Sequence, residues 1–534
     1  MRMKAWLGIL LAGWLPAGGA AGAAETAGVV AFPNSGAAAA QEDFLFGLAQ
    51  LHNFEYEDAA DAFRRAQRID PGFAMAYWGE AMTHNHPIWM QQDREAARAV
   101  LARLGATAEA RRAKAPTERE RQYLETLETL YGEGDKPERD RRYAETTAAL
   151  HRAHPEDPDA AAFHALALLG TAHVGRDLPT YMRAAAVLEP VFAAHPRHPG
   201  AAHYLIHSYD DPVHAPLGLR AARVYSQIAP AAAHAQHMTS HIFLALGMWD
   251  EVVAANETAA AVVDRARQRR GQPARVCGHY NNWLLYGYLQ QGRVADARRV
   301  LERCRAQAKE DAPHDRGEPH DPDNSAMGSF LYMRLRYLLD SGEWRGELAT
   351  MEIEAPAAAA RLTAEFTRGY GALERGELAA AKAAHARLAE ARAALPPDLE
   401  PPWAERAEIL ALELEARIAA LEGRGGEAVE VARRAAALEE AMPFAFGPPV
   451  VDKPSHELLG ELLLALDRPA EARAAFTQAL ARAPERTVSL LGLSRAATAA
   501  GDTVAAEAAR ARLRAIWHRA DRIPDEVAVD AGRG

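Results

Sequence analysis

Three common features are missing from this sequence. It contains no HExxH, G-x-S-x-G or Walker-type phosphate loop, so it matches no familiar hydrolase signature. It has no excess of basic residues: 61 Lys and Arg stand against 72 Asp and Glu, a formal net charge of −11, which argues against nucleic acid or an anionic membrane as the main partner. Beyond the N-terminus no apolar run approaches the length of a membrane-spanning helix, so we expect no transmembrane segment in the mature chain.

The start of the chain is typical of a secretory signal peptide. Arg2 and Lys4 form a charged start, residues 5–15 form an apolar stretch, and small residues, mostly alanine, continue to Ala24. The apolar stretch is too short to span a bilayer with ordinary flanks. We therefore predict that residues 1–24 are a signal peptide and that the mature protein is periplasmic or secreted. The alternative is an uncleaved membrane anchor.

Composition favours helices over strands. Hydrophobic residues make up 49% of the chain, and alanine is the most frequent of them. Alanine-rich segments that also contain Leu and Arg, with few β-branched runs, favour helix. A chain of 534 residues is too long for one compact core, but a repeat array avoids this limit because each unit packs only on its neighbours.

A pattern of small and aromatic residues recurs along the chain. Residues 53–71 carry Tyr56, Ala59, Phe63, Ala66 and Pro71, and residues 454–484 repeat the arrangement with Gly460, Ala472, Phe476, Ala479 and Pro484. Both stretches resemble the tetratricopeptide repeat (TPR), a helix pair of 34 residues. The resemblance implies an all-α, TPR-type α-solenoid, a right-handed superhelix of antiparallel helix pairs. In such arrays positions 2, 5, 9 and 12 of each first helix line a concave groove.

The repeats divide the chain into four parts. We predict a signal peptide at 1–24, a linker of small residues at 25–39, a TPR solenoid of about ten helix pairs at 40–520, and a flexible tail at 521–534. Residues 88–155 lack clear repeat markers, and residues 309–325 form a polar connection between units.

Histidines fall on the groove-facing positions of three successive units. Counted back from the turn at Gly247, positions 2, 5 and 9 are His234, His237 and His241. The preceding unit gives His203, His207 and Asp210, and the following unit gives His279, Asn282 and Tyr286. Steps of three and four keep residues on one helix face, so we expect these side chains to share one concavity. Asn85, near position 12 of an earlier helix, is a further candidate for the groove lining.

This spacing predicts a transition-metal site. Histidine pairs at i,i+4 (His203/His207 and His237/His241) and at i,i+3 (His234/His237) can each hold one ion from one helix face. With His279 the set numbers six, and an all-imidazole set suits zinc, copper, nickel or iron. Six ligands exceed one tetrahedral shell, so either two ions, or one ion with second-shell partners, is expected.

Two other functions remain open. The histidines could hydrogen-bond a peptide or protein ligand in the groove, the commonest use of TPR arrays. A bound ion with an open position could instead activate water, with Asp210 or Tyr286 as acid, base or orienting group. The protein would then be a metal-dependent hydrolase or oxidase, and the sequence leaves its status as an enzyme undecided.

Cys277 and Cys304 are a disulfide candidate. The repeat register places Cys277 at the start of one helix and Cys304 near the end of its antiparallel partner, so the two ends lie close together. An oxidising compartment would allow the bond, and closing a loop of this length stabilises a protein by roughly 3–4 kcal/mol in the chain-entropy model. The alternative is two buried free thiols.

Three segments also resemble a narrower group. They are the AYWG…N segment at 76–85, the HYxIH…HxxHMxSHI block within 203–257, and the KPSHELLGELLLAL segment at 453–466. Together they resemble exported bacterial TPR proteins, and the likeness covers most of the mature chain. It supports interpreting the three segments as parts of one architecture and implies no activity of its own.

Overall fold

The computed structural model describes residues 27–311, 325–355, 357–395 and 403–528. The signal peptide predicted for residues 1–24 lies outside these ranges. No helix within them is long and apolar enough to cross a membrane.

The first half of the chain is a run of helices in antiparallel pairs. They are α2 (Gln41–His52), α3 (Tyr56–Ile69), α4 (Ala74–Met82), α5 (Arg94–Leu104), α6 (Ala108–Arg112), α7 (Glu118–Leu130), α8 (Lys136–Ala153), α9 (Pro158–Leu169), α10 (Leu178–Ala194), α11 (Pro199–Ser208), α12 (Ala215–Ile228), α13 (Ala233–Ala245) and α14 (Trp249–Arg269). Each helix packs on its chain neighbours, and first helices of successive units, such as α9, α11 and α13, also pack on one another.

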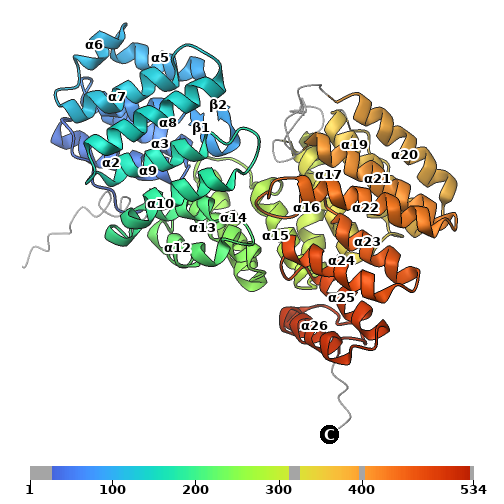
Figure 1. Cartoon of the computed structure of the whole chain (residues 1–534). Coiled ribbons are helices and arrows are strands. Elements are labelled where there is room, and N and C mark those ends of the chain that lie inside the picture. Colours follow the sequence, from blue (N-terminus) through green and yellow to red (C-terminus); the bar gives the residue numbers. More distant parts are fainter. Residues whose placement is uncertain (1–26, 312–324, 356, 396–402, 529–534) are drawn as a thin grey trace, which may run out of the picture.

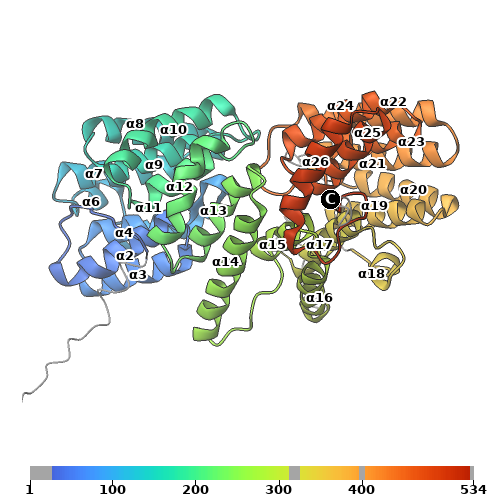
Figure 2. The same ribbon diagram turned by 90° about the horizontal axis from the view of Figure 1, so that it is seen from below.

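The second half continues the array. Its helices are α15 (His279–Gln290), α16 (Val294–Asp311), α17 (Ala326–Ser341), α18 (Glu347–Thr350), α19 (Ala358–Glu374), α20 (Leu378–Ala393), α21 (Trp403–Leu421), α22 (Gly425–Ala441), α23 (Ser455–Ala465), α24 (Pro469–Arg482), α25 (Thr487–Ala499) and α26 (Thr503–Ile516). Figure 1 shows the two halves as two arms that meet at α14 and α15, and Figure 2 shows the same division from below.

The repeat pattern has a direct packing explanation. A Cβ atom on Gly47 or Gly79 would lie 3.0 Å or 2.4 Å from the ring of Phe63. In the later unit a Cβ on Gly460 or Gly492 would lie 2.8 Å or 2.2 Å from Phe476. Glycine in the first helices therefore admits the aromatic ring of the second helix between them. The protein is an all-α solenoid of TPR type, as the sequence predicts.

A short hairpin interrupts the helices. Strands β1 (Asn85–His86) and β2 (Gln91–Gln92) pair antiparallel around the 3₁₀ helix η2 (Pro87–Trp89). Two further 3₁₀ turns, η1 (Ala38–Ala40) and η4 (Trp517–Arg519), flank the array. The chain leaves the helix-pair pattern at the hairpin, and helices α5 to α8 follow in the stretch that lacks repeat markers.

The segments next to the array are packed against it. In the stretch expected to be a linker, Ala27 is buried and the ring of Phe32 contacts Phe44, Trp78 and Tyr123. At the other end Val527 is buried against Leu490, Leu513 and Trp517. Cys277 and Cys304 are joined by a disulfide that ties the start of α15 to the last turns of α16.

Candidate metal centre

The six predicted histidines lie together where the two arms meet. His203 and His207 come from α11, His234, His237 and His241 from α13, and His279 is the first residue of α15. Their ring nitrogens form two groups in which the ligand atoms all lie within 4.8 Å of one another. We call His203, His207 and His234 triad I, and His237, His241 and His279 triad II.

In triad II two nitrogens with free lone pairs face each other. His237 Nδ1 lies 2.7 Å from Asn256 Oδ1, and Asn256 donates its own N–H to Val252 O, so His237 must donate from Nδ1. His241 Nδ1 lies 2.5 Å from Asp210 Oδ2 and also donates. With both rings neutral, both Nε2 atoms are bare, yet they are 3.0 Å apart. Nitrogens bound to one tetrahedral ion at 2.0–2.1 Å are about 3.3 Å apart.

Triad I has a similar arrangement. His203 donates from Nδ1 to the backbone carbonyl of His52 at 2.6 Å, which leaves Nε2 bare and 3.2 Å from Nε2 of His234. The acceptor is available because His52 ends α2, where carbonyls lose their helical partners. Nε2 of His207 is buried and has no hydrogen-bond partner among the described residues. A buried nitrogen of this kind is costly unless something binds it.

Burial disfavours the charged form of four of these imidazoles. It lowers the pKa of His203 to about 3 and, with repulsion from neighbouring histidines, lowers the pKa values of His207, His234 and His237 well below the ordinary value. Protonation of these four rings is thus disfavoured at neutral pH. A neutral imidazole is the form that binds a metal ion.

Aromatic rings enclose both triads. Phe54 lies 4.3 Å from His203 and 5.4 Å from His234, between ring centroids, and Trp89 from the hairpin lies 5.8 Å from His234. Trp283 lies 4.3 Å from His241. Phe54 adopts a left-handed backbone conformation with φ of 57°, which is costly for a bulky residue and persists where surrounding contacts impose it.

The histidine stripe is buried, whereas the sequence suggested an open groove. Five of the six histidines are at most 7% exposed, and His279 is half-buried. The turn after α2, the hairpin and the loop between α22 and α23 fill the concave face at this level. None of these segments belongs to the repeat units that supply the histidines, so the repeat register alone could not reveal them.

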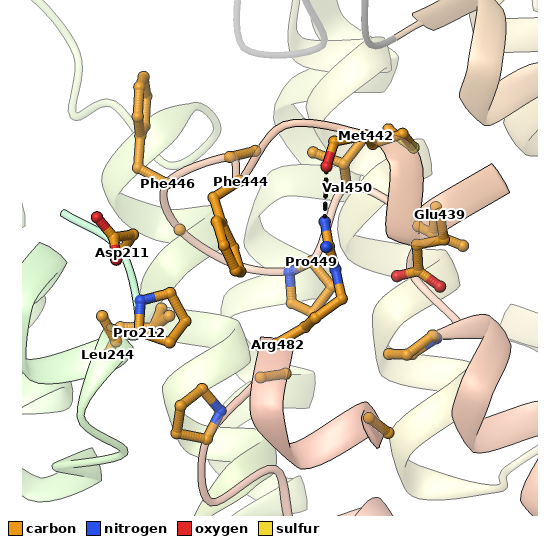
Figure 3. A pocket seen from close by; sticks show the side chains of 18 of the residues that line it. Asp211, Pro212, Leu244, Glu439, Met442, Phe444, Phe446, Pro449, Val450 and Arg482 are labelled. Carbon is orange, nitrogen blue, oxygen red and sulfur yellow. Dashed lines mark hydrogen bonds between the residues drawn. The ribbon is translucent and has the colours of Figure 1, made fainter. Parts of the chain in front are cut away.

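A cleft of about 70 Å³ adjoins triad II. It lies between the α11–α12 turn, with Asp211 and Pro212, and the loop after α22, with Phe444 and Phe446 (Figure 3). Arg482 donates to the carbonyl of Met442 and holds this loop from the far side. The Phe446 ring lies 5.7 Å from His241 and 6.4 Å from His207, so it separates the cleft from the histidines.

The other predicted site residues have different positions. Asp210 lines the cleft and orients His241. Tyr286 is buried and contacts Arg486, and burial raises its pKa to about 12. Asn282 accepts a hydrogen bond from Arg336. Asn85 accepts one from Gln92 within the hairpin. Asp210 is therefore hydrogen-bonded to a histidine of triad II.

A third cluster, which the sequence analysis missed, lies behind triad I. His52 Nε2 and His198 Nε2 contact Asp159 Oδ1 at 2.8 Å and 3.2 Å. His198 accepts from the backbone N–H of Ala201, and His52 accepts from Tyr204 OH. Each histidine therefore donates to the carboxylate and accepts elsewhere. The ring nitrogens of both histidines are satisfied without an ion, whereas Asp159 Oδ2 is buried without a hydrogen-bond partner among the described residues. Through His52 this cluster supports the carbonyl that holds His203.

The late KPSHELLG segment forms a separate buried ion network. Glu457 accepts from Lys453 at 3.0 Å, from Arg486 at 2.9 Å and from Ser489 at 2.5 Å. Lys453 and Arg486 lower the pKa of Glu457 to about 2, against the effect of burial. These contacts lie within α23 and its neighbours and do not involve the triads.

Comparisons with known proteins find solved structures of low similarity. No protein-family model matches the chain, and no curated protein matches it. Among solved structures it is similar to the APC/C hetero-tetramer Cut9–Hcn1, with 11% identity, a TM-score of 0.33, and 92% of this chain and 78% of that chain covered. It is also similar to a human IFIT1 dimer with m7Gppp-AAAA, with 14% identity and a TM-score of 0.32. That match covers 91% of this chain and 91% of the IFIT1 chain. An IFIT1 monomeric mutant with Gppp-AAAA has 14% identity and a TM-score of 0.35, and the match covers 88% of this chain and 95% of that chain. Likeness at this level carries no argument about ligand or activity.

Proposed function

We propose that the two triads bind two transition-metal ions and that the protein is an exported metal-binding solenoid. The observation that carries the proposal is the pair His237 and His241. Their Nδ1 atoms are committed to Asn256 and Asp210, and their bare Nε2 atoms face each other at 3.0 Å. Two lone pairs at this separation repel each other unless a cation lies between them, and burial lowers the pKa of His237 well below the ordinary value, which disfavours a proton on that ring.

The second shell supports the same proposal. Metal-binding histidines usually donate their other ring N–H to a carboxylate or a carbonyl, which fixes the ring orientation. His241 donates to Asp210, His203 to the carbonyl of His52, and His237 to Asn256. The cluster of His52, Asp159 and His198 provides the contrast, because there the histidines donate from Nε2 and no bare nitrogens converge.

The alternative, a peptide or protein held among these histidines, has less support. At most 7% of each of five rings is exposed, so a peptide would reach them only after displacement of the hairpin or of the loop that carries Phe446. Storage, delivery and metal-dependent chemistry all remain compatible with the centre, and Asp210 and the adjoining cleft are the features that chemistry would use.

Metal analysis tests the proposal. The full chain, expressed with export and without a histidine tag, is incubated in turn with zinc, copper(I) and iron(II), dialysed, and analysed by mass spectrometry. We expect about two ions per chain, about one in His207→Ala and about one in His279→Ala. The control is His164→Ala, because His164 is half-buried and lies against His151, away from both triads. Less than about a tenth of an equivalent of every metal would overturn the proposal.

A further inference from the structure

We propose that the two ions are copper(I) and that together they bind dioxygen. This inference rests on the proposed two-ion centre and adds the identity of the metal and its ligand. It starts from the ligand set: each triad offers three imidazoles, and neither includes a carboxylate or a thiolate. Three neutral nitrogen ligands are a sufficient shell for a monovalent copper ion, and imidazole is among the ligands that suit copper.

Charge is the next constraint. Two carboxyls contact the triads: Asp210 at the ring of His241, and Glu55, which accepts from the backbone N–H of His234 at 2.9 Å. Asp211 is already paired with Arg176 and His214. At most two negative charges therefore lie next to the two ion positions. Two copper(I) ions leave less positive charge uncompensated in a buried site than two divalent ions, and uncompensated buried charge is expensive.

The triads are close enough to share one ligand. The rings of His207 and His241 lie 5.9 Å apart, and those of His234 and His237 lie 6.2 Å apart, each pair with one ring in triad I and one in triad II. The ions would therefore occupy one enclosure. Its walls are the rings of Phe54, Trp283 and Phe446, so a small neutral molecule enters more readily than an anion or a bulky solute.

Dioxygen fits both the charge and the walls. It enters neutral, takes one electron from each copper(I), and becomes a peroxide-level ligand while both coppers become copper(II). No proton and no further reductant are needed for this step. The peroxide carries the two negative charges that offset the two new positive charges, so the net charge of the enclosure does not change.

The position of the carboxylates argues against a hydrolytic pair of zinc ions. Water activation by zinc needs a base near the metal-bound water. Asp210 lies behind its histidine, at Nδ1, and Glu55 lies behind the backbone of His234. Neither contact places a carboxylate on the side where the Nε2 atoms converge. A dizinc centre here would hold hydroxide without a base to direct it.

The test uses the full chain loaded with copper(I) without oxygen. We expect two copper(I) per chain, uptake of one dioxygen per copper pair at an oxygen electrode, and a new visible absorption band. His279→Ala should keep one copper and lose dioxygen uptake, because one copper supplies one electron. His279 is half-buried at a helix start, and circular dichroism checks its fold. The matched control, His164→Ala, should behave like the unmodified chain.

Each other outcome is decisive. Two bound coppers with no dioxygen uptake would overturn this inference but not the proposed metal binding. Displacement of the bound copper(I) by an equal concentration of zinc would have the same meaning. Dioxygen uptake that persists in His279→Ala would overturn the shared ligand. Absence of every metal would overturn both this inference and the proposed function.

Discussion

Replacing Asp210 with asparagine should weaken one ion site and spare the other. Asp210 Oδ2 lies 2.5 Å from His241 Nδ1, and both side chains are at most 3% exposed. Asparagine keeps the shape and an acceptor oxygen, so the ring should stay in place and only the negative charge is lost. Removing second-shell partners typically costs 10–100-fold in metal affinity, which is about 1.4–2.7 kcal/mol.

The expected signature is a two-step titration. His203 in triad I donates to the backbone carbonyl of His52, which the substitution does not touch. Competition with a fluorescent zinc chelator should therefore show one ion bound as before and the other bound 10–100-fold more weakly. Asp211→Asn is a poor control because Arg176 depends on it, so Asp250→Asn, at the partly exposed start of α14, serves instead. Equal weakening of both steps, or no change in either, would refute the assignment of Asp210 to triad II.

Two predictions concern stability. Arg486 and Lys453 hold the pKa of Glu457 at about 2 in the folded protein. As the pH falls, the carboxylate of Glu457 is therefore protonated in the unfolded chain before it is protonated in the folded one. The stabilisation that Glu457 gives the folded state is complete above about pH 4.5 and is lost as the pH falls towards 2. Glu457→Gln should flatten the acid limb of urea midpoints plotted against pH, and an unchanged limb would contradict the ion network. Gly492→Ala places a Cβ 2.2 Å from the ring of Phe476 and should lower the free energy of unfolding by about 1–3 kcal/mol. The control is Gly346→Ala, because Gly346 has open space around it, and this variant should change the free energy of unfolding by less than about 0.5 kcal/mol.

The fold could be predicted because it depends on contacts between neighbouring helices, and these contacts leave a regular spacing of residues in the sequence. Glycine and phenylalanine at fixed spacings report a close approach of neighbouring helices, and Gly47 with Phe63 makes that contact in the structure. The same register brought six histidines onto three adjacent helices, and the structure places all six in two groups. The glycine–phenylalanine contacts and the grouping within each triad both involve residues fewer than two repeats apart.

The rest of the site depends on contacts without a periodic signal. His52 O supports His203 from 151 residues away, and Phe446 reaches His207 and His241 from the loop after α22. The hairpin that carries Trp89 replaces part of a repeat. No spacing rule links these segments to the histidine stripe, so burial of the stripe, and the cluster at Asp159, could not be read from the sequence.

The span of these contacts sets the order in which the site can form during synthesis. The histidines lie between residues 203 and 279, and their helices can pair as soon as that stretch has left the ribosome. The aromatic cover from residue 446 arrives after well over a hundred further residues. For that interval a nascent chain presents a nearly complete ligand set that is open on one side. If the triads bind metal as proposed, ions can enter during that interval without any gate, and later closure of the last repeats would slow their release.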